Sequence, residues 1–316
     1  MKSRYLITSA NSGDASGLYM LETPTGSVQR LLPRECIGLA RVGSCYVLGC
    51  HTIHSRAQGP GHASSEHGTT NFAPHSLLVL NSALAVECEI ELTSYGIGDV
   101  HDIHPVPGGF ALTDTFGNRL VGFRCEAVPR HGAVPAGGLG YLRPDWQCRD
   151  RVCRQPDASH LTGFCLSEGR LLVAAFGRFA IHREYKHRQG LGVIMDMTEL
   201  AEPFARKAQS DSEPQELANE LADPHNLTVF EGSVYLAEAS RGRVLKNYRE
   251  FWRSAQSGYL RGLSIQRDKM LLGLSQPRRM GRDRAPAQVV EVDFRRSDLE
   301  RSYILPTSEV YNILNM

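Results

Sequence analysis

A short meander of strands recurs along this chain, and it restricts the possible folds more than any other feature. It is clearest in residues 98–123, where three apolar-rich segments are separated by the turns Pro107-Gly108-Gly109 and Phe116-Gly117-Asn118. Gly and Asn readily adopt the positive φ angles that tight hairpin turns need. Similar units begin at Ser159, Pro224 and Leu260, with a weaker one at Glu35. A meander repeated at intervals of about 35–65 residues predicts a β-propeller with loop insertions.

The two ends of the chain predict how the ring closes. Strands are expected at residues 4–10, 17–22 and 28–32, but this first block lacks the innermost strand that begins every other unit. Residues 308–314, SEVYNIL, have the pattern of that missing strand. Pairing them with residues 4–10 leaves no unpaired edge. We therefore predict an all-β chain, a single six-bladed β-propeller domain over residues 1–316 whose first blade is closed by the C-terminal strand.

Two segments do not fit the strand pattern and are predicted to be insertions. Residues 51–74 are rich in Gly, Ser and His. They are too polar for a core and too long for a hairpin, so we expect a mobile surface loop over one mouth of the ring. Residues 201–222 have helical propensity and no strand pattern, which predicts an insertion with a short helix.

Composition and charge exclude several classes of partner. The formal net charge is +1, which gives no bulk attraction to nucleic acid or to an anionic membrane. No apolar run approaches the ~18–20 residues of a membrane span, and the N-terminus has no signal-like segment. The eight Cys residues are scattered without a CxxC pair, which is typical of buried reduced thiols. These observations predict a cytoplasmic protein.

The predicted innermost strands share a pattern that places polar side chains together. Each has a variable residue, then a small or turn-type residue, then an apolar one. Because side chains alternate along a strand, residues two apart share a face, so the variable positions should form one ring in a central channel and the residues two positions earlier a second ring. The first ring contains Ile37, His104, Thr162, His225, Arg261 and Tyr311, and the second contains Glu35, Asp102, His160, Asp223, Tyr259 and Glu309.

Three imidazoles in these rings come from consecutive blades and predict a metal site: His104, His160 and His225. Neutral imidazole suits a divalent transition metal (Fe, Cu, Zn or Mn), and a nearby carboxylate such as Asp102 could bind the ion or fix a tautomer. The alternative is a metal-free polar pocket whose side chains bond water and one another. His101 has the opposite strand parity, so we expect it to form a hydrogen bond between blades.

Arg261 is the candidate ligand for an anion. Its guanidinium could bind a carboxylate, phosphate or sulfate through two hydrogen bonds. It could equally form an ion pair with Glu309 or Asp223, and the two roles are compatible. The predicted catalytic residues are accordingly Arg261, Asp102 and Glu309.

The order of several motifs resembles a bacterial β-propeller family known only as a domain of unknown function. The motifs are HDIHPVPGGFALTDT, SHLTGF, PHNLTVFEGSVYLAEASRGRV, YLRGLSIQRDKMLLGLSQPR and the terminal EVYNI. The resemblance covers the chain from about Glu35 onward and supports Asp102, His104, His160, His225, Arg261 and Glu309. The chain departs from the family at Thr162, where Asn is usual, and at Asn226-Leu227, where Ser-Pro is usual. The resemblance implies the fold and a pocket but no reaction; a looser similarity links the chain to six-bladed propeller lactonases and lyases.

Three functions are compatible with these residues. The first is a metal-dependent enzyme, an oxidase, lyase or hydrolase, acting on a small anionic molecule in the channel. The second is a propeller that binds or senses such an anion without chemistry. The third is a protein-interaction scaffold that works through its loops, although a polar channel lining argues against this as the whole function. The residues leave the choice between the first two open.

Overall fold

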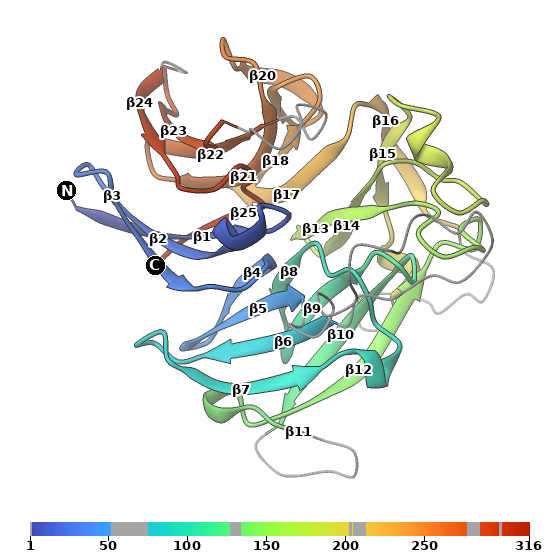
Figure 1. The fold of residues 1–316 in the computed structure, drawn as a ribbon. Coiled ribbons are helices and arrows are strands. Elements are labelled where there is room, and N and C mark those ends of the chain that lie inside the picture. The colour runs from blue at the N-terminus through green and yellow to red at the C-terminus, as the bar shows by residue number, and fades with distance from the viewer. Residues whose placement is uncertain are drawn as a thin grey trace, which may run out of the picture.

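A computed structural model describes residues 2–51, 75–126, 134–201, 204, 213–276, 285–296 and 299–316. Its strands form six small antiparallel sheets, which follow one another around a ring as the blades of a propeller (Figure 1). The prediction of a six-bladed all-β propeller is therefore confirmed. The described residues contain no α-helix, only the short 3₁₀ turns η1 (Gly13–Ala15), η3 (Thr93–Tyr95), η4 (Gly137–Leu139), η5 (Glu184–Lys186) and η6 (Thr198–Leu200).

Each blade extends from an innermost strand near the axis to an outer strand at the rim. Blade 1 contains, in this order, β25 (Asn312–Asn315), β1 (Ser3–Ser9), β2 (Gly17–Thr23) and β3 (Ser27–Leu32). Blade 2 contains β4 (Cys36–Val42), β5 (Cys45–His51), β6 (His75–Leu80) and β7 (Val86–Glu91). Blade 3 contains β8 (Ile103–Val106), β9 (Gly109–Asp114), β10 (Arg119–Glu126), β12 (Tyr141–Arg149) and β11 (Val134–Pro135).

The remaining three blades have four strands each. Blade 4 contains β13 (Leu161–Ser167), β14 (Arg170–Ala175), β15 (Gly192–Asp196) and β16 (Gln215–Leu221). Blade 5 contains β17 (Pro224–Phe230), β18 (Ser233–Glu238), β19 (Arg243–Lys246) and β20 (Arg249–Arg253). Blade 6 contains β21 (Tyr259–Gln266), β22 (Lys269–Ser275), β23 (Gln288–Asp293) and β24 (Leu299–Ile304).

The C-terminal strand closes the ring, as the sequence predicts. β25 pairs antiparallel with β1, with Leu314 opposite Leu6 and Ile313 opposite Ile7. Figure 1 shows the two termini on the same side of the ring, with β25 beside β1. The edge of β1 is thereby paired, so the first blade has the same four-stranded form as blades 2, 4, 5 and 6.

The apolar core is divided among the junctions between blades. Six clusters of buried side chains each join two neighbouring blades around the ring. The junction of blades 2 and 3 is representative: Val47 and Leu77 pack with Phe110 and Phe123, whose rings stack with centroids 5.2 Å apart. Because apolar burial lies between the blades, the innermost strands are free to carry polar groups.

The small or turn-type residue of the repeated pattern marks a β-bulge. The pairing register shifts between Leu161 and Gly163 in β13, and between Arg261 and Leu263 in β21. Gly262 has φ of 70°, and a Cβ there would lie 2.9 Å from Ile313 Cγ1, so a larger residue would be both strained and crowded. A bulge inserts one residue into a strand, so side chains on either side of it no longer alternate regularly.

The prediction of an insertion with a short helix at residues 201–222 is wrong for the second half of that segment. Residues Gln215–Leu221 form β16, which pairs with β15 as the outer strand of blade 4. Its helical propensity is overridden because β15 would otherwise present an unpaired edge. Residues 202–203 and 205–212 lie outside the described part of the chain, as does nearly all of the predicted loop at 51–74, from residue 52 onward. Residues 52–74 lie in sequence between β5 and β6.

Two further observations concern the thiols and membrane spans. All eight Cys are free, and six of them are buried. Among the described residues, no helix is long and apolar enough to cross a membrane.

Candidate metal centre

A pocket of about 760 Å³ lies where the six blades meet. Every blade contributes to its lining; one residue from each is, in blade order, Tyr311, Ile37, His101, His160, Asp223 and Arg261. This volume is in the range of about 300–1,000 Å³ that is usual for small-molecule sites. The pocket therefore suits a small ligand near the axis of the ring.

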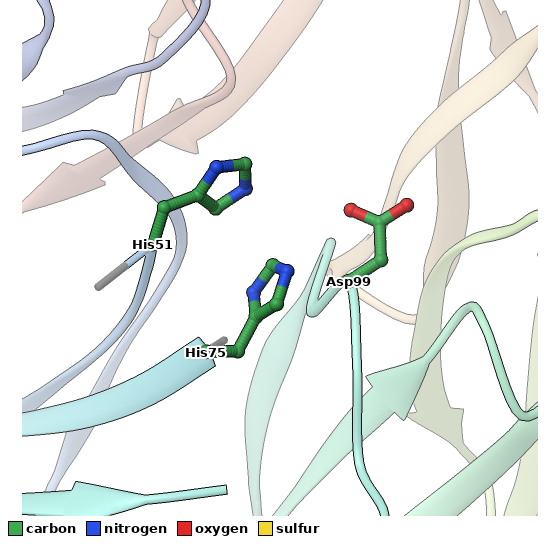
Figure 2. Close-up of side chains that lie close together, drawn as sticks. All are labelled: His51, His75 and Asp99. Atoms are coloured by element: carbon green, nitrogen blue, oxygen red, sulfur yellow. The ribbon is translucent and has the colours of Figure 1, made fainter. Parts of the chain in front are cut away.

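Two groups of potential metal ligands meet at Asp99 in this region. One contains His51, His75 and Asp99, and the other contains Asp99, His101 and His160. Within each group the candidate ligand atoms all lie within 4.8 Å of one another. Figure 2 shows the rings of His51 and His75 and the Asp99 carboxylate pointing toward a common space.

The local fold brings these five residues together from three consecutive blades. His51 ends β5 and His75 begins β6, so they are partners across the ladder with ring centroids 4.4 Å apart. Asp99 and His101 lie in the segment that leads into β8, and His160 immediately precedes β13. Asp99 and His160 have φ of 57° and 52°, so the chain turns sharply at both residues before entering the blade.

Carboxylates orient two of the imidazoles. His51 Nδ1 lies 3.0 Å from Glu35 Oε2, and His160 Nδ1 lies 2.7 Å from Asp157 Oδ1. Asp157 is held in turn by Arg183 Nε at 2.6 Å. This arrangement leaves Nε2 of each ring available, and Nε2 of His51 is buried with no hydrogen-bond partner among the described residues. Metal-binding histidines characteristically have such carboxylate partners, so the residues present fit a divalent transition metal.

The electrostatics of the group favour the protonation states that a cation requires. Burial, together with the neighbouring His51, lowers the pKa of His75 to about 3. Burial alone would raise the pKa of Asp99, but His101 and His160 outweigh it and lower that pKa. At neutral pH the His75 imidazole is therefore neutral and the Asp99 carboxylate is ionised, which are the states that metal binding requires.

The structure does not bring together the three imidazoles that the sequence grouped. His160 lies in the pocket, but His104 Nε2 lies 3.0 Å from Asp102 Oδ2, and its ring packs on Phe164 with centroids 5.0 Å apart. His225 is 3% exposed and packs against Phe176 and Tyr259. Among the described residues, neither His104 nor His225 belongs to a group with metal-ligand geometry.

Strand parity explains this difference. The two rings follow only if side chains alternate in direction along the whole innermost strand and also along the residues just before it. β8 begins only at Ile103, and His160 precedes β13 with a left-handed backbone, so alternation does not extend to His101 or His160. The sequence predicts for His101 only a hydrogen bond between blades. Its Nε2 instead lies 3.3 Å from Asp99 Oδ1, and its ring centroid lies 4.8 Å from that of His160.

Sequence reasoning missed Asp99, His51 and His75 for a simpler reason. The sequence pattern places His51 in the insertion and His75 in an ordinary strand, although these two residues flank the insertion and must face each other when β5 pairs with β6. Recognising that pairing would have identified them. Asp99 carries no repeat signal, because it lies in the turn before the repeated pattern.

Asp102, one of the predicted catalytic residues, lies away from the pocket lining. It is 2% exposed, and its carboxylate accepts hydrogen bonds from the backbone N–H groups of Ile103 and Phe164 and from Asn312 Nδ2. These partners belong to blades 3, 4 and 1. The contacts indicate that Asp102 ties blades together; a catalytic role for it stays a prediction.

Arg261 and Glu309 form the predicted ion pair, with Nη1 3.3 Å from Oε2. The guanidinium lies between the rings of Tyr259 and Tyr311, 4.5 Å from each centroid, and Tyr311 donates a hydrogen bond to Glu309. Both charged residues line the pocket. The ion pair is thus confirmed, and its position is compatible with contact to a ligand.

The His104–Asp102 pair predicts a pH-dependent stability. Burial alone would lower the pKa of His104, but the charge and hydrogen bond of Asp102 outweigh it and raise that pKa. The folded state then binds the proton more tightly, so this stabilisation is present below the unfolded pKa of about 6.5 and is lost as pH rises through the folded pKa. In urea unfolding, His104→Gln should lose more stability at pH 5.5 than at pH 8.5. His187→Gln, at an exposed site, is the control, and equal losses at both pH values would contradict the prediction.

Comparisons with known proteins bear on the fold. No family model and no curated protein matches the chain. A solved structure of a nidogen–laminin complex is similar over 100% of this chain and 98% of that one, with a TM-score of 0.59 and 11% identity. A protein of unknown function from Bacteroides caccae covers 100% and 99%, with a TM-score of 0.58 and 11% identity. A candidate 6-phosphogluconolactonase from Bacteroides fragilis covers 100% and 98%, with a TM-score of 0.55 and 10% identity. At such identities the likeness shows the propeller fold alone, a fold shared by proteins of several descriptions.

Proposed function

We propose that the protein is a metal-dependent enzyme that acts on a small anionic molecule in the central pocket, with Fe, Cu, Zn or Mn held at Asp99. One observation supports this most. Two imidazoles beside Asp99, those of His51 and His160, have Nδ1 fixed by a carboxylate while Nε2 stays available. Histidines with a purely structural role would not both need a carboxylate at Nδ1 that directs Nε2 toward the same region.

The charge of the pocket supports an anionic ligand. Its lining contains four cations, Arg183, Lys186, Arg241 and Arg261, and four acids, Asp99, Asp157, Asp223 and Glu309. These charges balance, so a bound divalent ion would make the pocket positive. The side chains of Arg183 and Arg241 are 48% and 44% exposed, so they can reach a ligand at the pocket mouth without being withdrawn from the core.

The chemistry follows from these groups. A bound metal of this kind polarises a carbonyl or activates water or oxygen, which is compatible with a hydrolase, a lyase or an oxidase. Arg261, fixed between two tyrosine rings, would orient the anionic part of the ligand. Asp157 would hold His160 in one tautomer, and Arg183 and Tyr185 would hold Asp157. Metal binding without turnover of any small anion would favour the non-catalytic sensor.

A matched pair of variants tests the metal site. Asp99 and Asp223 line the same pocket, and both have left-handed backbones, with φ of 57° and 53°. Asn tolerates this conformation, so Asp→Asn at either position should fold. In equilibrium dialysis with zinc or manganese, Asp99→Asn should weaken binding by about 100-fold or more, because losing even a supporting residue costs about 10–100-fold. Asp223→Asn should bind as the wild type does; equal affinities for all three proteins would refute the site.

A further inference from the structure

We propose that the site holds two metal ions, bridged by the carboxylate of Asp99. This inference rests on the proposed metal binding and goes beyond it in the number of ions and in the ligand they take. The observation behind it is that the two groups of candidate ligands share Asp99 and no other residue.

Geometry separates the two imidazole pairs. Ligands of one ion at metal–ligand distances of ~2.0–2.2 Å lie at most about 4.4 Å apart. The atoms of each group lie within 4.8 Å of one another, so each group can surround one ion after small side-chain adjustments. Within the described part of the chain, no such group combines His51 or His75 with His101 or His160. One ion therefore cannot take both pairs, whereas the two oxygens of Asp99 can serve one ion each.

Each pair also has its own supporting structure. On one side, Glu35 orients His51, and His75 is only 4% exposed, so both rings are held at the β5–β6 edge. On the other side, Asp157 orients His160, and His101 packs edge-on against the His160 ring. A single-ion site would need only one of these supports. The presence of both indicates two coordination positions, one on each side of Asp99.

Charge and ligand number indicate what such a centre would bind. Two divalent ions bring four positive charges, against three negative charges from the carboxylates of Asp99, Glu35 and Asp157, so the centre would keep a net positive charge. Each ion has three protein ligands, which leaves open positions on both. Carboxylate-bridged two-metal sites hold their ions about 3.5–4 Å apart, a spacing that suits the oxygens of one carboxylate or phosphate group. The predicted substrate class is accordingly a small molecule with a carboxylate or phosphate that spans both ions.

Manganese titration of the metal-free chain tests the inference. Wild type should bind two Mn²⁺ per chain by dialysis, and electron paramagnetic resonance should show two spin-coupled ions. His51→Ala and His160→Ala should each reduce the stoichiometry to one and remove the coupling. Asp99→Asn should lose both ions. The control is His225→Ala, since His225 has a buried nitrogen without a partner among the described residues but belongs to neither group; it should keep two coupled ions.

The outcomes separate this inference from the proposed function. One ion per wild-type chain, lost in only one of the two histidine variants, would overturn the bridged pair and leave a single-metal enzyme. Two ions without spin coupling would overturn the bridge. No bound manganese, zinc, iron or copper at all would overturn the proposed function as well. Near-ultraviolet circular dichroism of each variant shows that the fold is kept.

Discussion

Deleting residues 312–316 is expected to abolish cooperative unfolding of the entire ring. The deletion removes β25 and exposes the inner edge of β1. Loss of the buried Ile313 side chain alone costs about 2–5 kcal/mol, and each lost ladder hydrogen bond adds about 1 kcal/mol. The total approaches the whole stability of about 5–15 kcal/mol of an ordinary domain. Urea unfolding followed by circular dichroism should show no native baseline.

A shorter truncation is the matched control. Removing only residues 315–316 keeps Asn312, Ile313 and Leu314 paired with Thr8, Ile7 and Leu6. This variant should unfold cooperatively at a lower urea concentration than the wild type. If the longer deletion also unfolds cooperatively with a similar midpoint, closure by the C-terminal strand does not stabilise the ring.

The second large effect is expected for Asp102→Ala, which should destabilise the protein by about 3–5 kcal/mol, because three buried donors lose their acceptor at a cost of about 1–3 kcal/mol each. The substitution leaves the buried amides of Ile103 and Phe164 and the side chain of Asn312 without their acceptor. His104 also loses the partner that raises its pKa. Metal affinity of the folded protein should be unchanged, because Asp102 belongs to neither ligand group.

A surface substitution provides the comparison. Asp145→Ala breaks surface ion pairs with Arg124 and Arg143, whose side chains are 47% and 28% exposed, and should cost about 1 kcal/mol or less. Chemical denaturation gives both stabilities, and dialysis gives both metal affinities. If the Asp102→Ala protein is as stable as the wild type but no longer binds metal, Asp102 has the functional role that the sequence predicts.

The ring itself could be predicted from the sequence because its determinants are local and repeated. Turn residues such as Gly108 and Asn118 fix each hairpin, and the missing strand of the first block matches residues 308–314. The hairpins depend on backbone geometry that neighbouring residues impose, whereas the closing strand is found by comparing the first block with the other repeats. The outer strand β16 could not be predicted in this way, since its pairing with β15 is decided by the edge it covers.

The site was predicted only in part, because its residues lie where the repeat ends. Polar side chains were correctly expected at the meeting point of the blades, and the Arg261–Glu309 pair is present. The candidate ligand groups depend on bulges and left-handed residues such as His160, which strand parity cannot describe. The pairing of His51 with His75 joins residues on either side of a long insertion. That contact is set by the tertiary fold.

The central claim is that metal binds at Asp99, and anomalous diffraction from crystals grown with zinc tests it most directly. Data collected at the zinc absorption edge should show an anomalous peak beside the Asp99 carboxylate, within bonding distance of imidazole nitrogens, at about 2.0–2.2 Å. A peak between His104 and His225, or no ordered peak in the pocket, would contradict the account.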